Sequence, residues 1–135
     1  MAISYSTTLR NAMLAEIDTQ VNSGTAGGFL RIYSGTKPAP GGTATTLLAE
    51  LRFSDPAFGT PSNGVVSANA IADETATLAT GTATWFRVTN SSGTYVLDGT
   101  VGVTGSGADL ILNSTSISAN QIVKVSSFTI TEGNN

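Results

Sequence analysis

Turn-forming residues interrupt the chain at short intervals after residue 24, and this spacing limits the length of every later element. Proline and glycine gather at residues 37–42 and 55–64, where neither a helix nor the interior of a sheet can continue. The segments between these turns are rich in threonine, valine and isoleucine, whose branched side chains pack well on pleated sheets. The pattern predicts a mainly β fold, an antiparallel β-sandwich or small barrel of six to seven strands, with one N-terminal α-helix.

The N-terminal helix is predicted over residues 7–22, where the apolar pattern differs from the rest of the chain. Its apolar side chains recur every four residues: Leu9, Met13, Ile17 and Val21. Ser6, Thr7 or Thr8 can supply the N-cap oxygen, and Gly24 can end the helix in left-handed geometry. We therefore expect one amphipathic helix of about four turns.

The rest of the chain is predicted to form short strands within a single domain. That domain covers residues 1–135, with an N-terminal arm at 1–5, the helix at 7–22 and the β-sandwich at 29–131. The strands are expected at 29–33, 45–53, 65–71, 82–88, 94–98, 108–113 and 122–131. Residues 45–53 also fit a short helical turn, because their leucines follow neither period well.

The segments at 82–88 and 94–98 flank Asn90-Ser91-Ser92-Gly93, which predicts a β-hairpin. Side chains alternate across a strand, so Trp85 and Arg87 share one face of the hairpin and Phe86 and Val88 share the other. Because both faces carry bulky side chains, we expect this strand inside a sandwich or at an interface.

The final predicted strand changes phase along its length. Val123 and Val125 point to one side, whereas Phe128 and Ile130 fall on the opposite parity. One extra residue near Ser126-Ser127 reconciles the two halves, which predicts a β-bulge there.

Charge and hydropathy exclude several classes of partner. Nine acidic and six basic residues give a net charge of −3, and Lys and Arg form no cluster, so nucleic acid is not an expected partner. No window approaches about 18 consecutive apolar residues, and no basic segment precedes an apolar run at the N-terminus. We therefore expect no membrane span and no signal peptide. The chain has no cysteine, which excludes disulfides and thiolate metal sites.

Residues suited to catalysis are scarce. The chain has no histidine, which rules out a Ser-His triad. Asp73 and Glu74 are adjacent, so they point to opposite sides in a strand and are simply solvated in a loop. Neither arrangement predicts a working carboxylate pair. The carboxylates of Asp98 and Asp109 are of the type that binds hard cations, but they do not have the spacing of a calcium-binding loop. The Gly-rich segment 102–107 lacks the pattern of a phosphate-binding loop. We expect no enzyme activity, no cofactor and no metal site.

Four segments resemble a family of small virion structural proteins of tailed bacteriophages. They are Ser6 to Asn11, Leu30 to Pro38, and Gly81 to Val88 together with Leu112 to Thr115. The resemblance implies a capsid decoration, or cement, protein on the surface of the virion, made in the host cytoplasm. Its implied partner is the lattice of the major capsid protein. Capsid junctions have local threefold symmetry, so a homotrimer is the expected assembly.

Four residues are the candidates for partner binding: Ala2, Ile3, Tyr5 and Phe58. The first three lie in the arm, which can extend a neighbouring sheet or instead cover the protein's own core. Phe58 lies in the 55–64 loop and is either tucked under that loop or presented to a partner.

A different function remains open from the residues alone. In that alternative the protein is a tail or fibre module that binds host-surface carbohydrate. Trp85, Tyr33 and Tyr95 would then be exposed stacking platforms.

Overall fold

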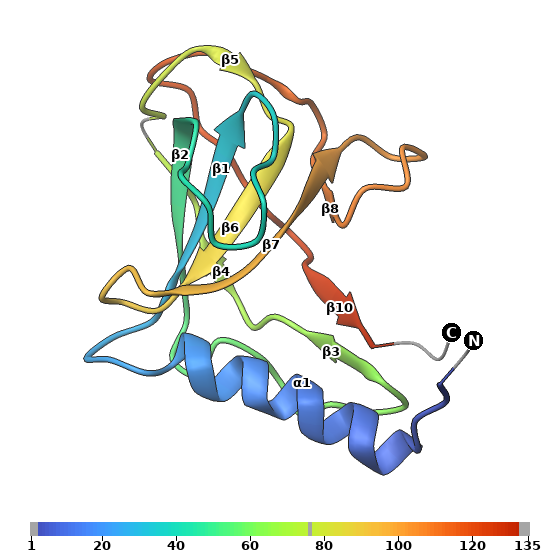
Figure 1. The fold of residues 1–135 in the computed structure, drawn as a ribbon. Helices are drawn as coiled ribbons and strands as arrows, with labels where there is room; N and C mark the ends of the chain where they lie inside the picture. Colours follow the sequence, from blue (N-terminus) through green and yellow to red (C-terminus); the bar gives the residue numbers. More distant parts are fainter. Residues whose placement is uncertain (1–2, 76, 133–135) are drawn as a thin grey trace.

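The computed structural model of this protein describes residues 3–75 and 77–132. Within them the chain forms one helix and ten short strands (Figure 1): α1 Thr7–Val21, β1 Phe29–Ser34, β2 Thr46–Phe53, β3 Val65–Ser67, β4 Ile71–Ala72, β5 Gly81–Thr82, β6 Trp85–Thr89, β7 Tyr95–Gly102, β8 Leu110–Ile111, β9 Ser116–Ile117 and β10 Thr129–Thr131. The predicted mainly β class with one N-terminal helix is therefore confirmed.

Six strands form a single curled sheet in the order β4-β2-β1-β6-β7-β8, which gives the molecule the shape of a half-barrel. The neighbouring strands are antiparallel, except that β7 and β8 run parallel. The predicted hairpin is confirmed as β6 and β7, and the segment at 45–53 is a strand, β2, not a helical turn. Two further two-stranded pairs, β10-β3 and β5-β9, lie outside this sheet.

The helix begins and packs in ways that the sequence predicted only in part. Ser6 is the N-cap, and its hydroxyl accepts a hydrogen bond from the Leu9 amide at 3.1 Å. The helix ends at Val21 with Asn22 as a right-handed C-cap, so the prediction that Gly24 closes it was wrong. The predicted apolar stripe was only partly right. Val21 is fully buried and Ile17 packs against the core, but Leu9 is 46% exposed and Leu14, outside the stripe, is fully buried.

The predicted C-terminal strands are much shorter in the structure. The segment at 108–113 contains only β8, and the segment at 122–131 contains only β10. Val123 makes a single bridge to Glu74, and no continuous strand joins it to β10 in the described residues. The change of phase is real, since Val123, Val125 and Phe128 are all buried. It occurs in irregular backbone, however, so the predicted β-bulge was wrong.

The hydrophobic core lies between the inner face of the sheet and the β3-β10 pair, with α1 along β3 (Figure 1). Four phenylalanine rings form its centre. Phe86 of β6 meets Phe128 edge-on at a centroid distance of 5.3 Å, and Phe53 and Phe58 lie 6.3 and 6.1 Å from Phe128. Segments far apart in the sequence therefore meet around one ring, Phe128.

Candidate binding surfaces

The outer face of the sheet, opposite the core, carries a buried ion pair. Arg87 of β6 donates to Asp98 of β7 from Nε at 2.7 Å and from Nη2 at 3.0 Å. The Arg87 and Asp98 side chains are only 11% and 2% exposed. The guanidinium carbon also lies 5.3 Å from the centre of the Trp85 ring and 5.2 Å from that of Tyr95. The hydrogen bond with Asp98 raises the pKa of Arg87 above its ordinary value.

The Pro/Gly-rich loop of residues 35–45, here called the latch loop, passes over the outer face of the sheet (Figure 1) and contacts this ion pair. Gly42 accepts a hydrogen bond from Arg87 Nη2 at 2.9 Å, and the Gly41 amide donates to Asp98 Oδ2 at 3.4 Å. At the end of the loop, Thr45 accepts from the indole of Trp85 at 2.9 Å. A loop without regular structure is thus held in place by side chains of the sheet.

A second, more open group of charges lies along β1 and β2. Arg31 pairs with Glu50 at 2.7 Å, and these side chains are 26% and 32% exposed. The Phe29 ring lies close to two guanidinium groups, 5.1 Å from that of Arg31 and 4.3 Å from that of Arg52. This part of the outer face is accessible to solvent, whereas the part under the latch loop is not.

The aromatic residues expected to stack on carbohydrate are mostly buried. Trp85 is 0% exposed and Tyr33 is 5% exposed, because their rings stack on each other at 4.3 Å under the latch loop. Burial also raises the pKa of Tyr33. Tyr95 is 39% exposed, so it is the one side chain of the three that a ligand can reach. Trp85 and Tyr33 are therefore not the exposed stacking platforms that the carbohydrate-binding alternative requires.

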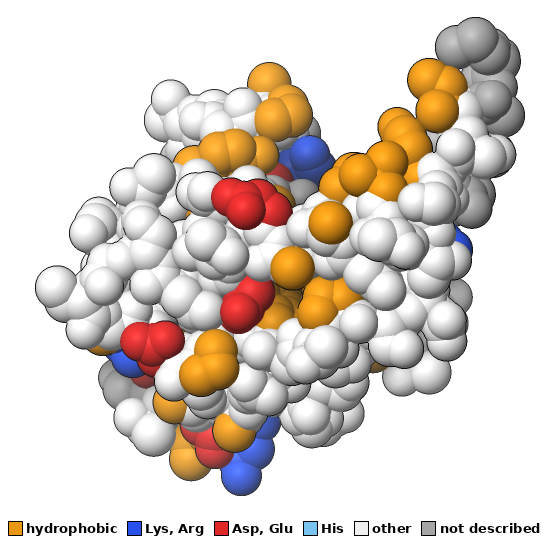
Figure 2. All heavy atoms as spheres, turned by 90° about the horizontal axis from the view of Figure 1, so that it is seen from below, with side chains coloured by type: hydrophobic (Ala, Val, Ile, Leu, Met, Phe, Trp, Pro, Cys, Tyr) orange, Lys and Arg blue, Asp and Glu red, His pale blue; other side chains and the backbone are white. Residues whose placement is uncertain are grey.

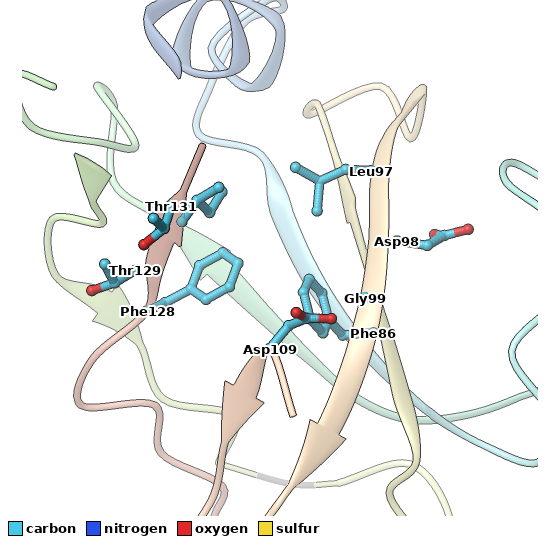
Figure 3. Close-up of a pocket in the computed structure, with 9 residues that line it drawn as sticks. Phe86, Leu97, Asp98, Gly99, Asp109, Phe128, Thr129 and Thr131 are labelled. Atoms are coloured by element: carbon cyan, nitrogen blue, oxygen red, sulfur yellow. The ribbon is translucent and has the colours of Figure 1, made fainter. Parts of the chain in front are cut away.

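A half-open pocket of about 370 Å³ lies where the half-barrel fails to close, between β7 and β10 (Figure 3). We call this gap the seam. Phe86, Leu97, Phe128 and Ile130 supply its apolar lining, and Asp109 reaches its rim from the segment before β8. Asp98 contributes backbone only, since its side chain points away from the pocket toward the outer face.

The predicted partner-binding residues do not form one site. Ala2 lies outside the described residues. Ile3 is 53% exposed and Tyr5 is half-buried, so the described part of the arm does not simply cover the core. Phe58 is 3% exposed and its ring lies 5.5 Å from that of Phe53, so it belongs to the core and is not presented to a partner.

Two exposed apolar side chains at the end of the half-barrel opposite α1 were not predicted from the sequence. Leu78 and Ile122 are 59% and 57% exposed, the largest values among the described large apolar side chains. They follow Thr77 and Gln121, which are joined by a backbone hydrogen bond of 3.1 Å, so the two side chains lie on neighbouring segments. We call Leu78 and Ile122 the apolar end. Neither residue belongs to a periodic pattern, which is why no signal in the sequence singled them out.

The rest of the surface is mainly uncharged and polar. Figure 2, the view from below, shows scattered acidic and basic groups, with hydrophobic side chains in small groups and along a projection at one corner. In the described ranges, no three acidic side chains come close enough to hold a metal ion. No described helix is long and apolar enough to cross a bilayer.

Comparison with known proteins adds no relative. No family model matches the chain, and no curated protein or solved structure matches it significantly.

Proposed function

We propose that this protein is a virion structural protein of a tailed bacteriophage that decorates the capsid. It binds the outer face of the major capsid protein lattice and stabilises the head. The observation that carries the proposal is the apolar end, where Leu78 and Ile122 are each more exposed than any other described large apolar side chain. Large apolar side chains this exposed on two neighbouring segments are typical of a protein–protein contact.

The surface fits such a contact better than it fits a ligand site. A decoration protein needs many weak contacts repeated over a lattice, and it needs no chemistry. The segments that resemble the virion family also have structural roles here. Ser6 caps α1, Asn11 accepts from the Gly64 amide at 2.9 Å, and Arg10 donates to the Glu132 carbonyl at 3.3 Å. These contacts join the helix to the β3-β10 pair.

The proposal is tested by adding purified protein to capsids that lack it. We expect saturable binding in a fixed ratio to the capsid protein and a higher temperature of capsid disruption. Ile122→Asp should weaken binding at least tenfold, because a charge at the apolar end must be desolvated in the contact. Thr82→Asp, at an exposed polar position of β5, is the matched control and should bind as the unmodified protein does.

Two results would contradict this function. One is no binding to capsids together with binding to host cells or glycans, which is the behaviour of a tail or fibre module. The other is equal binding by the Ile122→Asp and Thr82→Asp variants, which would exclude the apolar end as the contact.

A further inference from the structure

The seam between β7 and β10 has two open strand edges. In the ladder between β6 and β7, the Val101 amide donates to the Thr84 carbonyl, so alternate residues of β7 from Gly99 onward bond to β6. The backbone groups of Asp98 and Thr100 therefore point the other way, toward the seam. In the described chain β8 pairs only with Val101 and Gly102 of β7, which leaves Asp98 beyond its reach.

One edge of β10 is also open, with backbone groups that face the seam. The Ala68 amide donates to the Phe128 carbonyl, and the Glu132 amide donates to the Gly64 carbonyl. The even-numbered residues of the segment 128–132 therefore bond to the side of β3. The N–H and C=O groups of Thr129 and Thr131 consequently face the seam. Among the described strands β10 pairs only with β3, and this second edge is unpaired.

The floor of the seam is apolar, and its rim is partly capped. Phe86 lies directly over Gly99, where an added Cβ would come within 2.5 Å of the ring. Asp109 accepts from the Thr100 amide at 2.9 Å, so one end of the β7 edge is already satisfied by a side chain. The gap beside Asp98 has no such cap in the described residues, although unpaired strand edges are normally covered.

The N-terminal arm has the pattern of a strand that fits this gap. Its apolar Ile3 and Tyr5 share one parity and the polar Ser4 has the other, with no charged side chain from residue 2 to residue 6. None of residues 3–5 lines the seam of its own chain, and Ile3 and Ser4 are exposed. Figure 2 shows hydrophobic side chains along a projection at one corner of the molecule.

We propose that the seam accepts the N-terminal arm of a second copy of this chain as an added strand between β7 and β10. The arm's backbone pairs with Asp98 on one side and with Thr129 and Thr131 on the other. Ile3 and Tyr5 then pack on the Phe86 and Phe128 rings, and Ser4 faces outward. This association joins copies of the protein and does not depend on binding to a capsid.

Disulfide trapping tests the proposal, because the chain contains no cysteine of its own. Thr129 and Thr131 are exposed and point outward, as Ser4 would in the added strand. Chains with Ser4→Cys are mixed with tagged chains carrying Thr129→Cys or Thr131→Cys and are then oxidised. We expect the mixed disulfide dimer with at least one of the two. Thr46→Cys, an exposed position on β2, is the matched control and should give only background.

Charge substitutions in the arm give a second measurement. Ile3→Asp should weaken self-association at least tenfold in sedimentation velocity, because an apolar side chain buried in the seam becomes charged. Ser4→Asp adds the same charge at the outward position and should leave self-association within about threefold.

The proposal is overturned if the Ser4→Cys and Thr129→Cys or Thr131→Cys pairs yield no more mixed dimer than the Thr46→Cys control. It is also overturned if a single chain carrying Ser4→Cys and Thr131→Cys closes an internal disulfide as a monomer, since the arm would then fill its own seam. Equal effects of Ile3→Asp and Ser4→Asp would contradict it as well. Loss of capsid binding with intact self-association would affect the proposed function alone.

Discussion

At the scale of single residues, the outer face of the sheet holds two ion pairs that look alike in the sequence and differ in burial. Arg87–Asp98 lies under the latch loop and Arg31–Glu50 is open to solvent. A charge left unpaired in a buried site costs far more than one left in water. The latch loop therefore makes the Arg87 pair the more important of the two.

We predict that Arg87→Met lowers the free energy of unfolding by about 3 kcal/mol, because Asp98 loses its buried partner. Arg31→Met, on the same face, should lower it by about 1 kcal/mol or less. Urea denaturation measures both. Arg87→Met should also speed amide hydrogen exchange at Gly41, whose amide donates to Asp98. If the two substitutions proved equally costly, the latch loop would not protect the Arg87 pair.

At the scale of elements, the helix was predicted correctly, but only part of its predicted apolar stripe faces the core. A repeat of four residues drifts around an α-helix, because one turn takes 3.6 residues. The stripe Leu9, Met13, Ile17 and Val21 therefore does not stay on one face. Val21 is fully buried, whereas Leu9 is 46% exposed and Leu14, outside the stripe, is fully buried. Interactions between elements, not the apolar repeat alone, select the face.

The two leucines provide a direct test of that face. Leu14→Ala should lower the free energy of unfolding by about 2–5 kcal/mol, since Leu14 is fully buried and its loss leaves a cavity. Leu9→Ala should change it by about 0.5 kcal/mol or less, because Leu9 is nearly half exposed and alanine favours helix. Thermal or urea unfolding checks both variants. A larger loss for Leu9→Ala would mean that the helix packs by the stripe predicted from the sequence.

At the scale of the whole molecule, local signals were readable and distant pairings were not. The alternation in residues 82–98 and the turn between its two halves fixed the β6-β7 hairpin. In contrast, the parallel pairing of β7 with β8 and the pairing of β10 with β3 join segments that no local pattern relates. The candidate surfaces depend on those pairings. The seam exists because β7 and β10 each leave one edge open, so it could not be predicted before the strand order was known.

The titratable side chains of the whole molecule set how its stability depends on pH. The chain has no histidine, so we expect nearly constant stability between about pH 6 and pH 8. Burial raises the pKa of Tyr33 and of Tyr95 above the ordinary value of 10.0. The unfolded chain therefore releases these protons at lower pH than the folded protein does, and stability falls as the pH rises past about 10 and through the folded pKa values.

Tyr33→Phe should lessen this alkaline loss, because phenylalanine has no phenolic proton to release. The measurement compares free energies of unfolding in urea at about pH 7 and about pH 11, each variant being referred to its own value at neutral pH. This reference separates the titration from the change in packing against Trp85. An alkaline loss as large in Tyr33→Phe as in the unmodified protein would show that the buried Tyr33 phenol is not what makes the fold sensitive to alkali.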